Sequence, residues 1–428
     1  MTKSLSHTRA DRALDQFLRL SRLARQLGFS HQLIEDDVFE GDTIKLRGRT
    51  VVNFGLCSYL GLGDDPRLVE AAIDAIRRYG NSYSSSVAYT ALPMYHDLRE
   101  RLQAMFGSPV VVAGTTTLAH MSALPVIVRP GERVLVDAYA HASLISVMPS
   151  LQVNGSEVTK VSHNDLEAVA DAASSARDTV WYLVDGVYSM LGDTVPVMEL
   201  IDLLDAHPHL WVYCDDAHGL GWEGDRGQGY VLNRAGWHER LIMSFGLAKS
   251  FGTMGGVVAA QSERLIEAIS VTGGPMVFGG PLPPAILGAS VASADIHLSS
   301  ELAGLQAELS ERIEHVNSFS DEIGLPLATK AHTPMWFVEI GESIVTGSVV
   351  STMLHEGFFV NGAVFPAVPR GRGGVRFTVT RYNSLSQIEA MLTSLNEARL
   401  RHLTGEDVID LTVLEGSEED AQKGLKGP

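Results

Sequence analysis

Short apolar runs alternate with amphipathic stretches along most of this chain. From residue 66 to about residue 290, the runs are separated by segments whose apolar positions recur at helical spacing. Runs that are apolar throughout are typical of parallel strands, because the helices that connect such strands bury both faces of the sheet. The predicted strands are Pro109–Ala113, Arg133–Val136, Val180–Val184, Leu210–Cys214, Leu241–Phe245 and Gly256–Ala260.

The chain on either side of this region carries patterns of its own. Apolar residues at helical spacing predict a helix over residues 10–28, and alternation around a Gly turn predicts a β-hairpin over residues 43–54. The C-terminal part predicts a second, smaller α/β unit. Its predicted elements are a long helix over residues 285–320, strands near Met335–Ile340 and Gly374–Thr380, and a helix from Ser384 to His402.

These patterns predict an α/β fold with a large, mostly parallel sheet domain and a smaller C-terminal α/β domain. The expected regions are an N-terminal helix and hairpin segment over residues 1–55, a large domain over 56–290, a small domain over 291–405 and a flexible tail over 406–428.

Composition and charge narrow the class of protein. The 428 residues are 45% apolar and 20% charged, which is typical of a globular protein with a large core. No run of 18 apolar residues and no apolar signal core appear, so we expect no membrane span and a cytoplasmic location. The net charge of −18 disfavours nucleic acid as a partner. The two cysteines, Cys57 and Cys214, have no metal-ligand spacing, and we expect no metal.

Polar side chains follow two of the predicted strands directly. Asp215 and His218 come after Leu210–Cys214, and Lys249 comes after Leu241–Phe245. Groups just past the carboxyl ends of strands face the ligand crevice of an α/β sheet. A carboxylate, an imidazole and an amine are therefore predicted to meet in one crevice.

This combination points to pyridoxal phosphate. A lysine amine forms Schiff bases with carbonyls, and the pyridine nitrogen of this cofactor needs a carboxylate to stay protonated. Lys249 and Asp215 fit these two tasks, and His218 is placed to hydrogen-bond the ring hydroxyl or the aldimine. Each residue alone is more typical of a loop cap or a surface amine, whereas the three on two neighbouring strand ends favour the cofactor.

A phosphate site is indicated where Gly114, Thr115 and Thr116 stand between a predicted strand and a predicted helix. Free backbone N–H groups at a helix N-terminus bind anions, and the threonine hydroxyls add donors. A plain helix cap explains the same residues equally well. By contrast, the GxGxxG match Gly219–Gly224 is followed by more loop instead of a helix, which argues against a dinucleotide site.

Two segments of the chain resemble the α-oxoamine synthase family of fold-type I pyridoxal-phosphate enzymes. Asp215–Gly221 matches the family's Asp-(Asp/Glu)-x-His-(Gly/Ala)-x-Gly segment, and Gly246–Gly252 matches its lysine segment in part. The resemblance covers roughly residues 40 to 400. It implies that Lys249 holds the cofactor and moves a proton, and that Asp215 keeps the pyridine ring protonated.

Further segments carry the same resemblance and imply further roles. Asp137–Ser143 resembles the segment in which His141 stacks on the pyridine ring. Asp185–Met190 resembles the segment that places Asp185 and Ser189 beside the cofactor and its hydroxyl, and Arg376 takes the position that grips the amino-acid carboxylate.

The chain departs from the family pattern around the phosphate and the acyl donor. Gly246 stands in place of a threonine, Gly279–Pro281 replaces a Thr-Thr-Ser segment, and the loop Ser84–Ala91 lacks the family's arginine. We expect Thr115, Thr116, Thr117 and Ser244 to compensate for the missing hydroxyls. The acyl donor is left open between coenzyme A and a carrier protein.

The resemblance implies a homodimeric acyltransferase that condenses an α-amino acid with an acyl thioester, with decarboxylation, to give an α-aminoketone. Two alternatives remain at this stage. One keeps the cofactor but performs aminotransfer or other α-carbon chemistry, and the other is an inactive binding or scaffold protein with the same fold.

Overall fold

The computed structural model describes residues 14–15, 18, 21–22, 24–26, 28, 30–39, 41–365 and 367–403. About half of the predicted helix over 10–28 lies outside these residues, and the predicted tail lies wholly outside them. Within the described part, no helix is both long and apolar enough to cross a membrane.

The helices are α2 Pro66–Tyr79, α3 Pro93–Phe106, α4 Thr116–Ile127, α5 Ala142–Ile145, α6 Met148–Val153, α7 Leu166–Ser175, α8 Val197–Ala206, α9 Tyr230–Ala235, α10 Glu263–Thr272, α11 Gly274–Phe278, α12 Pro284–His297, α13 Glu301–Glu322, α14 Ser343–His355 and α15 Leu385–Leu403.

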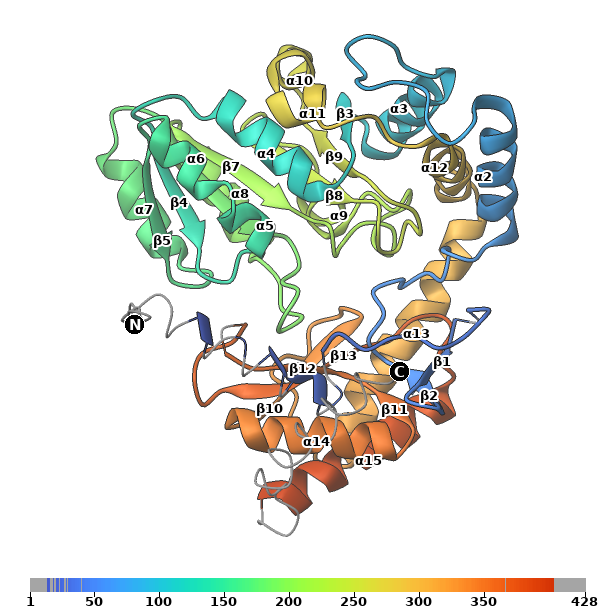
Figure 1. Ribbon diagram of the computed structural model, residues 1–428. Coiled ribbons are helices and arrows are strands. Elements are labelled where there is room, and N and C mark those ends of the chain that lie inside the picture. Colours follow the sequence, from blue (N-terminus) through green and yellow to red (C-terminus); the bar gives the residue numbers. More distant parts are fainter. Residues whose placement is uncertain are drawn as a thin grey trace, which may run out of the picture.

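A seven-stranded sheet forms the centre of the larger part of the molecule (Figure 1). Its strands lie in the order β3-β9-β8-β7-β6-β4-β5, and β9 runs antiparallel to both of its neighbours while the other pairs are parallel. This arrangement confirms the predicted mostly parallel sheet. The strands are β3 Val110–Ala113, β4 Arg133–Asp137, β5 Glu157–Val161, β6 Val180–Asp185, β7 Leu210–Asp215, β8 Leu241–Gly246 and β9 Gly256–Ala259.

Strand β5 is the one strand of this sheet that the apolar pattern does not predict. It lies at the sheet edge, pairs with β4 alone, and exposes Glu157, Thr159 and Lys160. An edge strand with polar side chains buries too little apolar surface to show as an apolar run.

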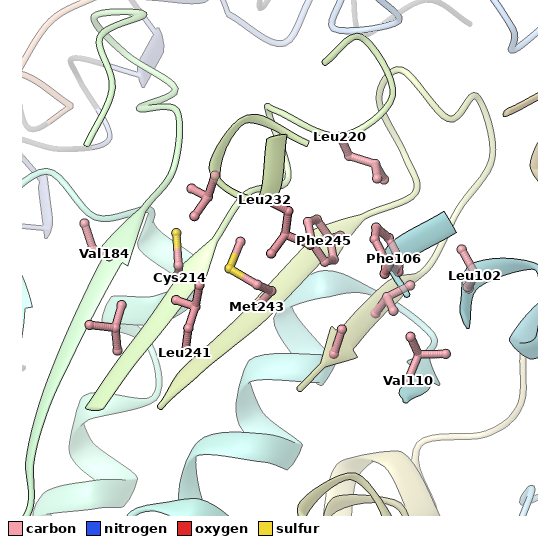
Figure 2. Close-up of a cluster of buried hydrophobic side chains, with 14 of the residues drawn as sticks. Leu102, Phe106, Val110, Val184, Cys214, Leu220, Leu232, Leu241, Met243 and Phe245 are labelled. Carbon is pink, nitrogen blue, oxygen red and sulfur yellow. The ribbon is translucent and has the colours of Figure 1, made fainter. Parts of the chain in front are cut away.

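The central strands β6, β7 and β8 are apolar because helices cover both faces of the sheet. Alternate residues of these strands enter two separate cores: Tyr182 and Val212 face one, and Trp181 and Tyr213 face the other. Figure 2 shows the first core, where Phe245 stacks on Phe106 with ring centroids 4.3 Å apart. Helices α3, α7, α8, α9 and α12 contribute to this core, and α4, α5, α6, α10 and α11 contribute to the other.

The prediction of one long helix over residues 285–320 is wrong, because two helices occupy this stretch. Helix α12 ends at His297 and α13 begins at Glu301. Between them, the Ser299 hydroxyl donates to the Ile296 carbonyl and accepts from the Glu301 N–H. Serine side chains that bond nearby backbone groups in this way compete with helical hydrogen bonds and favour helix ends.

The smaller part of the molecule combines both ends of the described chain (Figure 1). An antiparallel sheet in the order β10-β13-β12 packs against α14, and α15 packs on α14. The N-terminal hairpin joins this part, since β2 pairs in parallel with β11. The strands are β1 Thr43–Leu46, β2 Arg49–Asn53, β10 Met335–Gly341, β11 Phe358–Phe359, β12 Asn361–Ala363 and β13 Gly373–Thr378. The predicted hairpin, C-terminal strands and final helix are therefore confirmed, and the domain limits at residues 55, 290 and 405 stay predictions.

Candidate active site

The carboxyl ends of three central strands lie side by side and carry polar residues. Asp185 ends β6, Asp215 ends β7, and the strand register pairs Asp185 with Asp215 and Asp215 with Ser244 of β8. Lys249 lies in the turn that follows β8. A pocket opens at this edge of the sheet, as the sequence predicts. Its lining residues are Thr115, Thr116, Thr117, His141, Ser143, Asp185, Val187, Asp215, Ala217, His218, Ala248, Lys249, Met254 and Gly255.

Asp215 is held in its ionised form by its neighbours. Its Oδ2 lies 3.0 Å from Nε2 of the fully buried His120, and its Oδ1 accepts a hydrogen bond from the Ala217 N–H at 3.1 Å. Burial raises the pKa of this carboxyl, but the charge and hydrogen bond of His120 and the charge of Lys249 outweigh burial and lower it. A lasting negative charge therefore faces the pocket floor.

His120 is a residue that sequence reasoning did not single out. It lies in α4, and its Nδ1 is 2.9 Å from the Tyr213 hydroxyl, so the imidazole bridges two residues of β7. An isolated histidine within an apolar helix is typical of a core position. Only the packing of α4 on the sheet shows that this one contacts Asp215.

Asp185 differs from Asp215 although the two residues are register partners. Burial and the charge of Asp215 raise the pKa of Asp185 well above its ordinary value, because two neighbouring carboxylates resist carrying charge together. The Asp185 carboxyl accepts the backbone N–H of His141 at 3.1 Å. It therefore fixes the loop that carries His141 to the pocket.

His141 caps the short helix α5 and is exposed toward the pocket. Its Nδ1 lies 2.7 Å from the Ser143 hydroxyl, which fixes the orientation of the ring. Desolvation by the pocket walls, followed by the charges of Lys249 and His120, lowers the pKa of His141 against the opposing charge of Asp215. The ring is thus neutral at pH 7, which suits stacking on another ring.

His218 is buried, and its Nδ1 lies 2.8 Å from the hydroxyl of Tyr59. Burial, Lys249 and Arg376 lower the pKa of His218 well below its ordinary value, so its imidazole is neutral. Tyr59 is a second site residue for which the sequence analysis predicts no role. It belongs to the Tyr-Leu-Gly-Leu stretch at residues 59–62, which brings the N-terminal part of the chain to the site.

The predicted phosphate cradle lies at the N-terminus of α4. Thr115 is the N-cap, and its hydroxyl accepts the Leu118 N–H at 3.1 Å. Thr115 and Thr116 line the pocket, while Gly114 precedes them without lining it. The helix cap is therefore confirmed, and the anion site at the same turn stays a prediction.

Besides Gly114, three predicted residues do not line the pocket: Ser189, Ser244 and Arg376. Ser244 is fully buried within β8. Arg376, on β13, donates from Nε to the backbone carbonyl of Ser189 at 2.5 Å and lies with Nη2 3.7 Å from the Cys57 sulfur. Among the described residues, Arg376 forms no ion pair with a carboxylate, and its hydrogen bonds go to the Ser189 carbonyl and to the Cys57 and Met335 sulfur atoms.

These residues fit pyridoxal phosphate. The pocket combines the Lys249 amine for the aldehyde, an ionised Asp215 for the ring nitrogen, and the free N–H groups at the start of α4 for the phosphate. No group of three or more His, Cys, Asp or Glu side chains that suits a metal ion occurs in the described part of the chain.

Comparison with known proteins agrees with this site. Residues 49–388 match the family described as aminotransferase class I and II, and the chain therefore belongs to that family. It is a pyridoxal-phosphate-dependent transferase with the predicted fold, and its resemblance to the α-oxoamine synthases is confirmed.

Within the family, the chain is similar to 8-amino-7-oxononanoate synthases. It is 31% identical over 375 residues to that of Saccharophagus degradans, covering 86% of this chain and 91% of the relative. It is 29% identical over 356 residues to that of Thermoanaerobacter pseudethanolicus, covering 82% and 88%. The structure of serine palmitoyltransferase from S. paucimobilis superimposes with a TM-score of 0.84 over 92% of this chain and 99% of that one. At 21% identity, this last likeness concerns the fold.

Proposed function

We propose that this chain condenses an α-amino acid with an acyl thioester to give an α-aminoketone, carbon dioxide and a free thiol. The observation that carries the proposal is the pocket in which Lys249, the ionised Asp215 and the start of α4 meet, with Arg376 beside it. The similarity to 8-amino-7-oxononanoate synthases supports this reaction over aminotransfer and over an inactive scaffold.

The central residues divide the work between the cofactor ring and the reacting carbon. When bound, pyridoxal phosphate supplies an electron sink for the amino-acid α-carbon. Asp215 keeps a proton on the ring nitrogen, because His120 and Lys249 hold the carboxylate ionised. Lys249 Nζ holds the aldehyde and later carries the proton to and from the α-carbon. The neutral ring of His141, which lines the pocket, would pack against the bound cofactor.

The surrounding residues orient the cofactor and the amino acid. In our proposal, His218 and Ser189 bond the ring oxygen, Asp185 fixes the His141 loop, and Arg376 binds the substrate carboxylate with its planar fork. The residues that hold the phosphate are Gly114, Thr115 and Thr116, with Ser244 behind them on β8.

Assembly, acyl carrier and location are part of the same proposal. A homodimer is supported by exposed apolar side chains on two adjoining segments: Tyr89 is 78% exposed and Phe278 is 81% exposed, and the Ser86 hydroxyl bonds the Val277 carbonyl. We propose a cytoplasmic enzyme whose acyl group arrives on coenzyme A or on an acyl-carrier protein.

The reaction is tested by measuring free thiol and carbon dioxide when the protein, pyridoxal phosphate, an acyl thioester and a panel of amino acids are mixed. We expect equal amounts of both products with one amino acid, and neither product from a Lys249→Ala variant. Transfer of the amino group to a 2-oxo acid, without thiol release, would show that the chain is an aminotransferase.

A further inference from the structure

Gly246, the last residue of β8, lies directly against the start of α4. A Cβ atom placed on Gly246 would lie 2.9 Å from the Thr116 hydroxyl oxygen and 3.0 Å from the Ala217 Cβ. Thr116 and Ala217 both line the pocket. A side chain at residue 246 would therefore crowd the Thr116 hydroxyl.

A second glycine holds Thr116 in this place. Gly256 of β9 is the register partner of Gly246, and a Cβ on Gly256 would lie 2.5 Å from the Thr115 carbonyl oxygen and 2.6 Å from the Thr116 Cα. The two glycines thus let the first turn of α4 lie directly against the ends of β8 and β9. Because backbone atoms make this contact, the position of Thr116 is set by the sheet.

The hydroxyls of the first two threonines differ in what they bind. The Thr115 hydroxyl is engaged as the helix cap on the Leu118 N–H, whereas the Thr116 hydroxyl has no hydrogen-bond partner among the described residues. Thr116 is also the first residue of α4, whose free N–H groups favour an anion. An uncommitted hydroxyl donor therefore stands at the anion-binding end of the pocket.

We propose that the Thr116 hydroxyl is the side-chain ligand of the cofactor phosphate. In this proposal Thr116 replaces a hydroxyl-bearing residue at position 246, where this chain has glycine. The family's lysine segment carries a threonine where this chain has Gly246. Here α4 supplies the hydroxyl, and the glycine makes room for it. This inference rests on the pyridoxal-phosphate site proposed above and assigns its phosphate end.

The first test measures equilibrium binding of pyridoxal phosphate and of pyridoxal, which lacks the phosphate, to the apoprotein by fluorescence quenching. Thr116→Val keeps the side-chain shape and removes the hydroxyl, so we expect its Kd for pyridoxal phosphate to rise about tenfold or more while its Kd for pyridoxal stays unchanged. Thr272→Val, at an exposed position of α10, serves as the matched control and should change neither Kd.

The second test uses a double-mutant cycle of Thr116→Ala and Gly246→Thr. Each single change should weaken pyridoxal phosphate binding, the first by loss of the hydroxyl and the second by crowding against Thr116. In the double variant the space is free and a hydroxyl is restored, so we expect tighter binding than in either single variant. Thermal melts of the apoproteins identify any variant that fails to fold.

Two results would overturn the inference while leaving the cofactor assignment intact. One is an equal loss of pyridoxal and pyridoxal phosphate binding in Thr116→Val, which would show a structural role alone. The other is a double variant that binds more weakly than both single variants. If the unaltered protein bound no pyridoxal phosphate, the proposed function would fail and this inference with it.

Discussion

At the residue scale, the pocket depends on neighbouring ionisable groups that are kept in different states. Asp215 is ionised because His120 and Lys249 oppose the effect of burial, while the pKa of its register partner Asp185 is raised by burial and by Asp215. His141 and His218 are neutral for a related reason, since desolvation and the charge of Lys249 lower the pKa of both. The site thus presents one fixed anion among neutral rings.

His120 is predicted to act through Asp215. In His120→Phe the carboxylate loses the hydrogen-bonding partner that helps to lower its pKa, so the pKa of Asp215 rises and the acidic limb of the kcat/KM pH profile moves to higher pH. The loss of a hydrogen bond to a charged group should lower kcat/KM by roughly 10- to 100-fold at pH 7. His120→Gln, which retains a side-chain donor, should recover part of this loss. An unshifted pH profile in His120→Phe would contradict the role given to His120.

At the element scale, strand ends and turns are what the sequence reveals best. The runs that became β6, β7 and β8 are apolar because helices bury both of their faces, so the order of strands and the residues that follow them could be predicted. Strand β5 and the break between α12 and α13 could not, because they depend on an exposed polar edge and on one serine hydroxyl. His120 and Tyr59 reach the site only through packing between elements.

The turn after β7 encloses Asp216, whose pKa is raised to about 8, first by burial and then by the charges of Asp215 and Glu223. Cβ atoms on Gly186, Gly219 or Gly229 would lie within 2.5 Å of its carboxyl oxygens. Since the folded pKa lies above the unfolded one, this group's contribution to stability is complete below about pH 4 and is lost as the pH rises toward 8.

Asp216→Asn is therefore predicted to stabilise the protein in alkaline solution. Between pH 4 and 8, the free energy of unfolding of the variant minus that of the unaltered protein should increase with pH, by at most about 1.4 kcal/mol per pH unit. The side-chain oxygen of asparagine can still accept the Val231 N–H, which Asp216 binds at 3.0 Å. Urea unfolding of both proteins at pH 5 and pH 8 measures the difference. A gap that does not widen with pH would contradict the raised pKa.

At the scale of the whole molecule, the site joins parts that are distant in the chain. Arg376 comes from β13 of the smaller part and contacts the Ser189 carbonyl beyond the end of β6, and Tyr59 connects the N-terminal part to His218. The family resemblance named Arg376 from its segment alone. Its contacts with Ser189 and Cys57 follow from the way the two parts pack, which no local pattern encodes.

Arg376→Lys is predicted to weaken amino-acid binding and to leave cofactor binding unchanged. Lysine keeps the charge but lacks the planar fork that binds a carboxylate in a bidentate way. We expect the KM for the amino acid to rise by about 10-fold or more, with an unaltered Kd for pyridoxal phosphate. Steady-state kinetics and cofactor titration measure the two quantities. A change confined to the KM of the thioester would assign Arg376 to the acyl donor instead.

The proposed homodimer is tested by placing a charge on one of the exposed apolar segments. Phe278→Asp should shift the protein from dimer to monomer in analytical ultracentrifugation, because a buried unpaired carboxylate opposes association. Val153→Asp is the control, since Val153 is 87% exposed at the end of α6 and is not part of these segments. A dimer that persists in Phe278→Asp would place the interface elsewhere.

The central claim, that Lys249 anchors pyridoxal phosphate in this pocket, is tested most directly by borohydride reduction followed by peptide mass spectrometry. The purified protein mixed with the cofactor should show a visible absorbance band that reduction removes. The reduced cofactor should then be attached to the peptide that carries Lys249, and Lys249→Ala should show neither the band nor the label. Attachment to a different lysine, or the same band and label in Lys249→Ala, would contradict the account.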